Sequence, residues 1–258
     1  MTTVNRQSLI IPYGTNRWDE NVFSTTGGGH EVLTFECRTR FVVIDPARHA
    51  PYRLNGGRYE FPSPPNLRLL PTVWDQLGYL EEHFLGLCGT WAKYQQLFVT
   101  RYFDFIRARV EEEKEPLSAR IASFGDLYEY RDWAFSALRP FPQAYLHAPK
   151  VPGGEALPTA GDFVAVDIAF WTGREIVVID LGNPETADPF QRRRMERIRD
   201  AGIAVTSIAP AVLDGGDMMH LRDALPVSFS NFWEGELAPA RPFVDTKLED
   251  IDPGDIGF

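Results

Sequence analysis

The sequence has little cysteine, with only Cys37 and Cys88 among 258 residues. Two cysteines cannot build a disulfide framework or a cysteine-rich zinc site, and this usage is typical of a reducing compartment. The five histidines form no H-x-H or H-x-x-x-H pair, so the sequence gives no support for a zinc centre. Any chemistry must therefore rest on other residue types.

Long apolar runs are also missing. No stretch of about 18 apolar residues occurs, and the N-terminal MTTVNRQSLIIPYG lacks the apolar segment of a signal peptide. We therefore expect a soluble, cytoplasmic protein that contacts no membrane. Signatures of nucleotide binding and serine hydrolysis are missing too. No G-x-G-x-x-G follows a strand pattern, no GKS or GKT follows the GGG at 27–29, and there is no G-x-S-x-G.

The sequence also lacks an excess of positive charge, because its formal net charge is −10. Such a chain does not bind nucleic acid through its overall electrostatic field. The charge is uneven, however: Phe190–Arg199 carries five arginines, whereas the tail after Val244 is acidic. A basic stripe on an acidic body fits either a partner protein or a short, confined contact with nucleic acid.

The patterns that are present divide the chain into three regions. The first 70 residues or so are rich in strand and turn signals, and Thr72–Val110 has apolar residues at helical spacings of three and four. The acidic run at 111–115, followed by Pro116, predicts an internal boundary. The predicted regions are an N-terminal part at 1–115, a core at 116–235 and an acidic tail at 236–258.

The core region predicts a helix, three strands, a second helix and a fourth strand. The turn at Thr172-Gly173 indicates a hairpin, and Asp188-Pro189 and Gly202 are typical helix start and stop signals. The predicted elements are a helix over 117–138, a strand over 141–150, a hairpin of Phe163–Trp171 with Glu175–Leu181, a helix between Asp188 and Gly202, a strand over 203–210 and a short helix over 217–225.

Each arm of the hairpin carries one aspartate inside an apolar run, Asp167 in the first and Asp180 in the second. A buried carboxylate is costly, so it shifts its pKa, pairs with a cation or binds a metal. In a hairpin centred near Gly173 the two are cross-strand or diagonal neighbours. Carboxylates that close repel each other, and a divalent cation such as Mg²⁺ relieves the repulsion. The pair therefore predicts a metal site.

With an acid in each hairpin arm, this order of elements resembles the PD-(D/E)XK superfamily of restriction-endonuclease-like nucleases. The resemblance covers about Leu117 to Phe232 and matches Asp167 and Asp180 to the family's two acids. It implies an α/β (α+β) fold with an αβββαβ core and a mixed central sheet, to which the β-rich and helical N-terminal part is added. It further implies Mg²⁺ or Mn²⁺ as cofactor and DNA phosphodiesters as substrate.

The sequence departs from the family pattern at one position, since Gly182 stands where the family has lysine. The resemblance implies that Gln191 on the following helix takes a catalytic part instead, and that Glu129 is a third metal ligand. It also implies nucleic-acid contacts for Arg192, Arg193, Arg194 and Arg197. Two other readings stay open. Asp167 could be a structural residue bonded to a backbone amide or to an arginine such as Arg174, and Glu129 could lie at a solvated surface position.

The expected function is thus a metal-dependent nuclease that works with a protein partner. In the family, such chains are often paired with antiviral defence proteins, including Argonaute-type guides. Two alternatives remain open. A catalytically inactive adaptor could keep the fold and bind a protein or nucleic acid, which Gly182 favours. A substrate-binding α/β protein could use both aspartates purely for structure.

Overall fold

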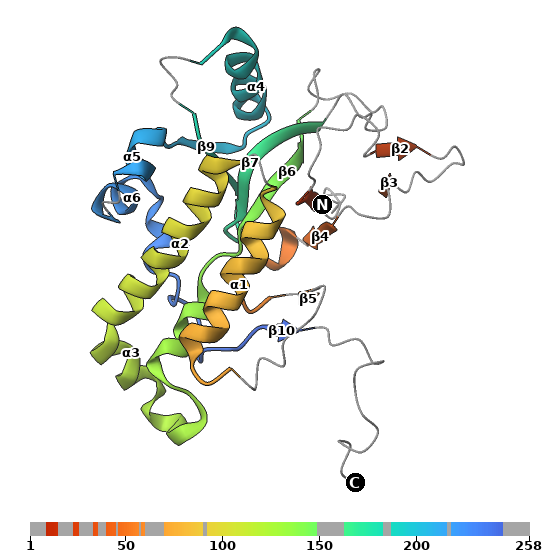
Figure 1. Ribbon diagram of the computed structural model, residues 1–258. Coiled ribbons are helices and arrows are strands. Elements are labelled where there is room, and N and C mark those ends of the chain that lie inside the picture. The colour runs from red at the N-terminus through yellow and green to blue at the C-terminus, as the bar shows by residue number, and fades with distance from the viewer. Residues whose placement is uncertain are drawn as a thin grey trace.

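A four-stranded mixed sheet forms the centre of the computed structural model (Figure 1). Its order is β6-β7-β8-β9, in which β6 (Phe141–His147), β7 (Phe163–Trp171) and β8 (Ile176–Asp180) are antiparallel neighbours. Strand β9 (Ala204–Ser207) runs parallel to β8. The structure describes residues 9–14, 23–25, 33–35, 40–44, 46–56, 58–59, 70–89, 92–148, 163–182, 187–215 and 218–244. The prediction of a mixed α/β fold is confirmed.

The central hairpin forms where the sequence predicts it. The backbone N–H of Thr172 donates to the carbonyl of Glu175 at 3.1 Å, closing the turn between β7 and β8. Gly173 has a φ of +93°, and a Cβ there would lie 2.7 Å from the carbonyl oxygen of His49. Only glycine meets both the positive φ and the close backbone approach.

Helix α4 (Pro189–Asp200) makes the crossover from β8 to the parallel strand β9, as predicted. The Asp188 side chain accepts a hydrogen bond from the backbone N–H of Gln191 at 2.8 Å, and proline occupies the first helical position. Gly202, with a φ of +76°, ends the helix. The short helices α5 (Pro210–Asp214) and α6 (Met218–Ala224) follow β9, and only α6 was predicted.

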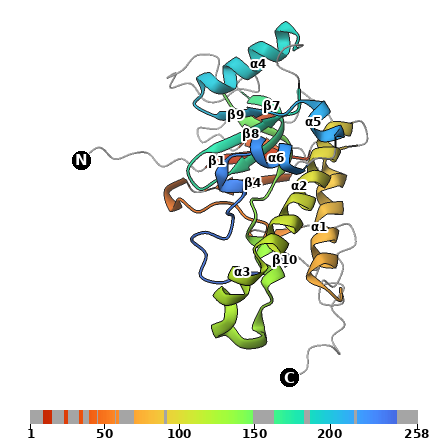
Figure 2. The same cartoon turned by 90° about the vertical axis from the view of Figure 1, so that its left-hand side faces the viewer.

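The predicted helical region before the core consists of two helices, α1 (Val73–Leu87) and α2 (Lys93–Glu112). They pack side by side along the sheet (Figures 1 and 2). The ring centroids of Phe98 and Tyr102 on α2 lie 6.4 and 5.3 Å from that of Phe170 on β7. Helix α2 is therefore a covering layer of the sheet.

The single helix predicted over 117–138 is wrong. Helix α3 (Lys114–Ile121) is followed by two 3₁₀ segments, η4 (Ala122–Leu127) and η5 (Tyr130–Ser136). Gly125 has a φ of +61°, which breaks the helical path, and Glu129 is extended. A capping box between Glu129 and Asp132 then starts a new segment. These local signals override the apolar spacing.

The boundary predicted after residue 115 does not divide two cores. Pro116 lies in the first turn of α3, where a missing N–H leaves no helical bond unmade. One cluster of buried apolar side chains runs from Ile11 to Trp233 and draws on both sides of that position. Residues before and after 115 therefore share one core.

The N-terminal region contains short strands, as predicted. Strands β1 (Leu9–Tyr13) and β4 (Arg40–Ile44) are antiparallel, as are β2 (Phe23–Thr25) and β3 (Leu33–Phe35). Strand β5 (Arg58–Tyr59) pairs in parallel with β10 (Phe243–Val244). Short 3₁₀ segments lie at Pro46–Arg48 and Val227–Phe229. Of the predicted acidic tail over 236–258, residues 236–244 are described and include β10, and the part beyond Val244 lies outside the described residues. In the described ranges, no helix is both long and apolar enough to cross a membrane.

A buried arginine ties this region to the core. Arg139 donates to the hydroxyl of Tyr13 at 2.8 Å and to the carbonyl of Gly56 at 3.1 Å. Its guanidinium carbon lies 4.2 Å from the ring centroid of Tyr59. Cation–π contacts of this kind strengthen when they are shielded from water. The N-terminal strands are therefore held to the start of β6.

Candidate functional site

Four polar residues form one row across the central sheet. In the register of β7 and β8, Ile168 pairs with Ile179, so the next position along each strand sets Asp167 opposite Asp180. Asp180 in turn pairs with Ser207 on the parallel strand β9. On the other side, Gln143 of β6 stands opposite Asp167, between two regular pairs. The structure thus brings the two predicted aspartates together.

The backbone is distorted at this row. Gln143 has a φ of +48°, an uncommon conformation for a residue other than glycine, in the middle of β6. Its side-chain Nε2 donates to the carbonyl of Cys88, at the end of α1. Conformations of this kind persist where the surrounding contacts impose them, and they are concentrated at functional sites.

Asp167 accepts a hydrogen bond on each carboxylate oxygen. Gln95 Nε2, from the first turn of α2, lies 3.0 Å from Oδ1, and the backbone N–H of Leu181 lies 2.9 Å from Oδ2. A carboxylate has about four lone-pair positions, so each oxygen keeps a further site. Asp167 is therefore held in place without being saturated.

Asp180 has weaker partners and a shifted pKa. Its Oδ1 lies 3.7 Å from Arg194 Nη2 on α4, and its Oδ2 accepts from Ser207 Oγ at 3.3 Å. Burial and then the charge of Asp167 raise the pKa of Asp180, while Arg194 and Ser207 lower it only in part. The surroundings of Asp180 therefore disfavour the ionised form of its carboxyl group.

Gly182 lies against this carboxylate. A Cβ at residue 182 would be 3.6 Å from Oδ2 of Asp180, which is ordinary contact distance. The family that the chain resembles has a lysine at this position, so its side chain would begin next to the two acids. The cation that the structure does place beside Asp180 is Arg194.

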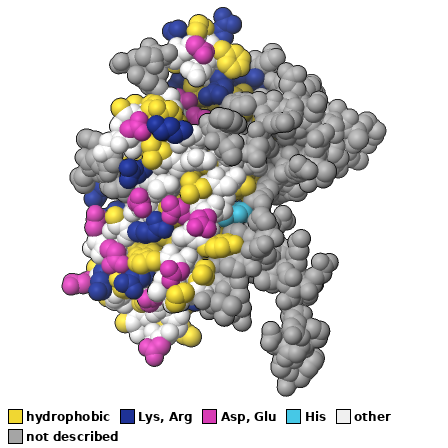
Figure 3. Space-filling view, in the orientation of Figure 1, with side chains coloured by type: hydrophobic (Ala, Val, Ile, Leu, Met, Phe, Trp, Pro, Cys, Tyr) yellow, Lys and Arg dark blue, Asp and Glu magenta, His cyan; other side chains and the backbone are white. Residues whose placement is uncertain are grey.

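The arginines predicted to contact nucleic acid split into two groups. Arg194 reaches Asp180, and Arg197 Nε donates to the carbonyl of Ala148 at 2.5 Å, so both turn toward the sheet. Arg192 and Arg193 are exposed. Figure 3 shows basic side chains at the top of the view, over α4. Gln191 is also exposed in the first turn of α4, and within the described ranges its side chain has no hydrogen bond to either aspartate.

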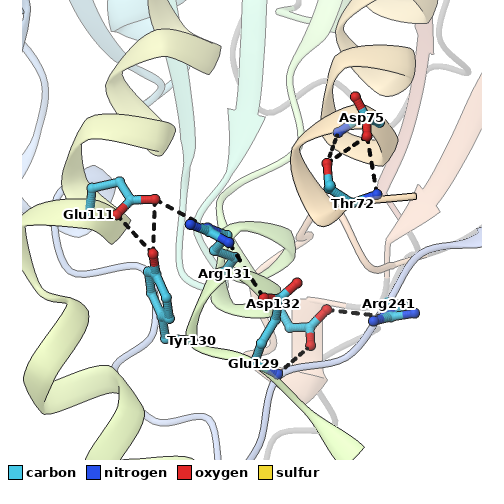
Figure 4. Close-up of polar contacts among 8 residues, drawn as sticks. All are labelled: Thr72, Asp75, Glu111, Glu129, Tyr130, Arg131, Asp132 and Arg241. Carbon is cyan, nitrogen blue, oxygen red and sulfur yellow. Dashed lines mark hydrogen bonds and ion pairs between the residues drawn. The ribbon is translucent and has the colours of Figure 1, made fainter. Parts of the chain in front are cut away.

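The prediction of Glu129 as a third metal ligand is wrong. The Glu129 carboxylate lies 3.7 Å from Arg131 Nη1. Arg131 Nε in turn donates to the carboxylate of Glu111, near the C-terminal end of α2 (Figure 4). Glu111 and Gln95 are 16 residues apart on α2, which corresponds to about 24 Å of helix. In the part of the chain that is described, no group of three or more His, Cys, Asp or Glu side chains could hold a metal ion.

The structural alternative for Asp167 is borne out in part: its carboxylate accepts from the backbone N–H of Leu181 at 2.9 Å, whereas no ion pair joins it to Arg174 among the described residues. Arg174 is exposed in the hairpin turn, where its backbone N–H donates to Thr172 Oγ1 at 3.4 Å. The partners that the sequence analysis missed are Gln95 and Ser207. Ser207 could have been identified by aligning the predicted strand over 203–210 in parallel with the strand that carries Asp180. No local sequence pattern links Gln95 to Asp167, which lies 72 positions later.

Comparison of the chain with known protein families, curated proteins and solved structures gives no match. The function must therefore be inferred from the site itself. Two half-buried carboxylates face each other, with one amide, one hydroxyl and one guanidinium around them. Hard divalent cations bind to oxygen-rich settings of this kind, and the guanidinium adds a site for phosphate charge.

Proposed function

We propose that the chain is a metal-dependent nuclease of the PD-(D/E)XK type, with Asp167 and Asp180 as ligands of Mg²⁺ or Mn²⁺. One observation carries the proposal: the two aspartates occupy one register position on adjacent strands, and the pKa of Asp180 is raised by burial and by Asp167. A purely structural arrangement would not place like charges together, because the repulsion destabilises the fold.

The order of elements supports the same reading. An antiparallel β6-β7-β8 meander, the α4 crossover and the parallel strand β9 follow the βββαβ order of the resembled family. Both acids lie near the end of β8 where α4 begins its crossover.

The residues present fit a divalent cation. Asp167 and Asp180 would hold the ion, and their mutual repulsion gives it a favourable place to bind. When bound, it would supply Lewis-acid stabilisation of the charge that develops on phosphoryl oxygens. Arg194 keeps a permanent charge beside Asp180, so it can stabilise phosphate but cannot remove a proton. The exposed Arg192 and Arg193 are available to the backbone of the nucleic acid.

The overall charge supports a role for a partner. A net charge of −10 opposes the approach of nucleic acid to the body of the protein. We therefore propose that a protein partner, such as a guide protein of a defence system, delivers the substrate to the site.

The direct test is cleavage by the purified chain. We expect Mg²⁺- or Mn²⁺-dependent cutting of plasmid or oligonucleotide DNA by the wild type, abolished by chelation. Asp167→Asn and Asp180→Asn should each lower the rate at least about 100-fold, because removing a metal ligand removes its charge stabilisation. Asp200→Asn, at the exposed end of α4, serves as the matched control and should leave the rate unchanged.

The adaptor remains a second candidate, because two observations favour it. Gly182 replaces the family lysine, and a guanidinium already lies beside Asp180. An adaptor would cut nothing with either ion, alone or with its partner, yet it would bind DNA in a fluorescence anisotropy assay. In that case, substitution of Arg192 and Arg193 by alanine should weaken binding, while Asp167→Asn should not.

A further inference from the structure

Gln95 is a polar residue of α2 that reaches the acid pair from outside the strands. It lies in the first turn of the helix and is half-buried. Its Nε2 donates to Asp167 Oδ1 at 3.0 Å, and the contact joins positions 72 residues apart. The N-terminal part of the chain therefore contributes directly to the candidate site.

The other end of the same amide has no partner. Gln95 Oε1 is buried and, within the described residues, accepts no hydrogen bond. The hydrogen bond from Nε2 to a carboxylate fixes which end of the amide is which, because a carboxylate can only accept. A buried acceptor left unmade is costly, so it indicates that a donor or a cation is missing there.

The neighbouring residue provides a contrast. Gln96 is also half-buried, but its Nε2 donates to the carbonyl of Gly89 at 2.8 Å, which ties α2 to the end of α1. Gln96 has no hydrogen bond to either aspartate among the described contacts. Two adjacent glutamines thus have different roles, one toward the site and one toward the helix connection.

We propose that Gln95 completes the cation site. Its amide N–H orients Asp167, and its amide oxygen is a third, neutral oxygen ligand for the divalent ion. Amide carbonyls are ordinary ligands of hard cations. A neutral ligand also avoids adding a third negative charge to a pair that already repels. This inference rests on the proposed function, and it assigns to Gln95 the place that Glu129 does not fill.

Calorimetric titration of the full-length chain with MnCl₂ tests the assignment, with circular dichroism to confirm folding of each variant. Gln95→Ala should weaken Mn²⁺ binding by about 10- to 100-fold, the usual loss when a supporting group of a metal site is removed. Gln96→Ala should bind like the wild type. Gln95→Glu should lower the Tm without metal, because it adds a like charge, and should bind Mn²⁺ at least as tightly as the wild type.

Two results would overturn the assignment in distinguishable ways. In the first, wild type binds Mn²⁺ and Asp180→Asn abolishes binding, but Gln95→Ala binds like wild type. Gln95 Oε1 is then only hydrated, and the inference fails while the proposed function stands. Equal weakening by Gln95→Ala and Gln96→Ala would likewise reduce Gln95 to a structural role. If wild type binds no Mn²⁺ at all, the proposed function fails together with the inference.

Discussion

The two ends of helix α2 hold acidic side chains in opposite arrangements. At the C-terminal end, Glu111 accepts from the hydroxyl of Tyr130 at 2.9 Å and from Arg131 at 3.2 Å (Figure 4). Burial alone would raise the pKa of Glu111, but the hydrogen bonds from Tyr130 and Arg131 hold it below its usual value. Nearby, the fully buried Asp132 is paired with Arg241 at 3.0 Å.

At the N-terminal end, the acids face each other instead. Asp167 and Asp180 share one register position, and the cationic partner of Asp180, Arg194, is 3.7 Å away. Here burial and the like charge of Asp167 outweigh the effects of Arg194 and Ser207, so the pKa of Asp180 is raised. One end of the helix therefore stabilises carboxylates, whereas the other keeps a carboxylate pair under repulsion.

This difference is why we assign a structural role to the acids at one end and propose a functional role for the pair at the other. Charged groups that serve the fold are matched by partners that lower their energy, as at the C-terminal end. A site that must bind a cation or substrate keeps its charges unmatched, at a cost to stability. The comparison makes opposite predictions for substitutions at the two ends.

The largest stability effect is expected at Asp132. Its carboxylate accepts from the backbone N–H of Glu129 at 2.9 Å and from Arg241, and its side chain is fully buried. Asp132→Ala should therefore lower the free energy of unfolding by about 2–3 kcal/mol, since a helix cap and the hydrogen bond from the half-exposed Arg241 to a buried carboxylate are lost together. Urea titration measures this, with the exposed Asp126→Ala as control. A loss below about 0.5 kcal/mol would mean that this end is not a structural cluster.

A smaller effect of opposite sign is expected at Asp180. Without metal at pH 7, Asp180→Asn should raise the Tm, on the order of 2 °C for a chain of this size, because it removes a half-buried charge that faces the like charge of Asp167. A lower Tm would instead make the Asp180–Arg194 contact a structural ion pair, and the comparison would fail.

The pH dependence of that effect has a definite direction. The folded-state pKa of Asp180 is raised, so the unfolded chain ionises first as pH rises. The penalty is absent below the ordinary aspartate pKa, grows between the ordinary and the raised pKa, and is constant above. The Tm difference between Asp180→Asn and wild type should follow that course in chelator-treated samples, and a difference that shrinks with rising pH would contradict it.

Local signals in the sequence predicted part of this arrangement. The Thr172-Gly173 turn and the Asp188, Pro189 and Gly202 signals define the hairpin and α4 within a few residues, so the acid pair could be placed on facing strands. These elements are specified by short-range chemistry, such as a positive φ or a side-chain cap.

The errors arose where long-range packing or a competing cap decides the structure. The apolar spacing over 117–138 suggests a helix, but Gly125 and the Glu129–Asp132 capping box divide it. That division carries Glu129 to the far end of α2. Gln95 was missed because its partner, Asp167, is 72 residues away, and only the packing of α2 on the sheet brings them together.

The central claim is that Asp167 and Asp180 converge on a place for a divalent ion. Anomalous diffraction at the manganese edge, from crystals soaked in MnCl₂, tests it most directly. We predict a single anomalous peak within coordination distance of both carboxylates, lost in Asp180→Asn crystals. Soaked wild-type crystals without a peak there, with Arg194 still against Asp180, would contradict the claim.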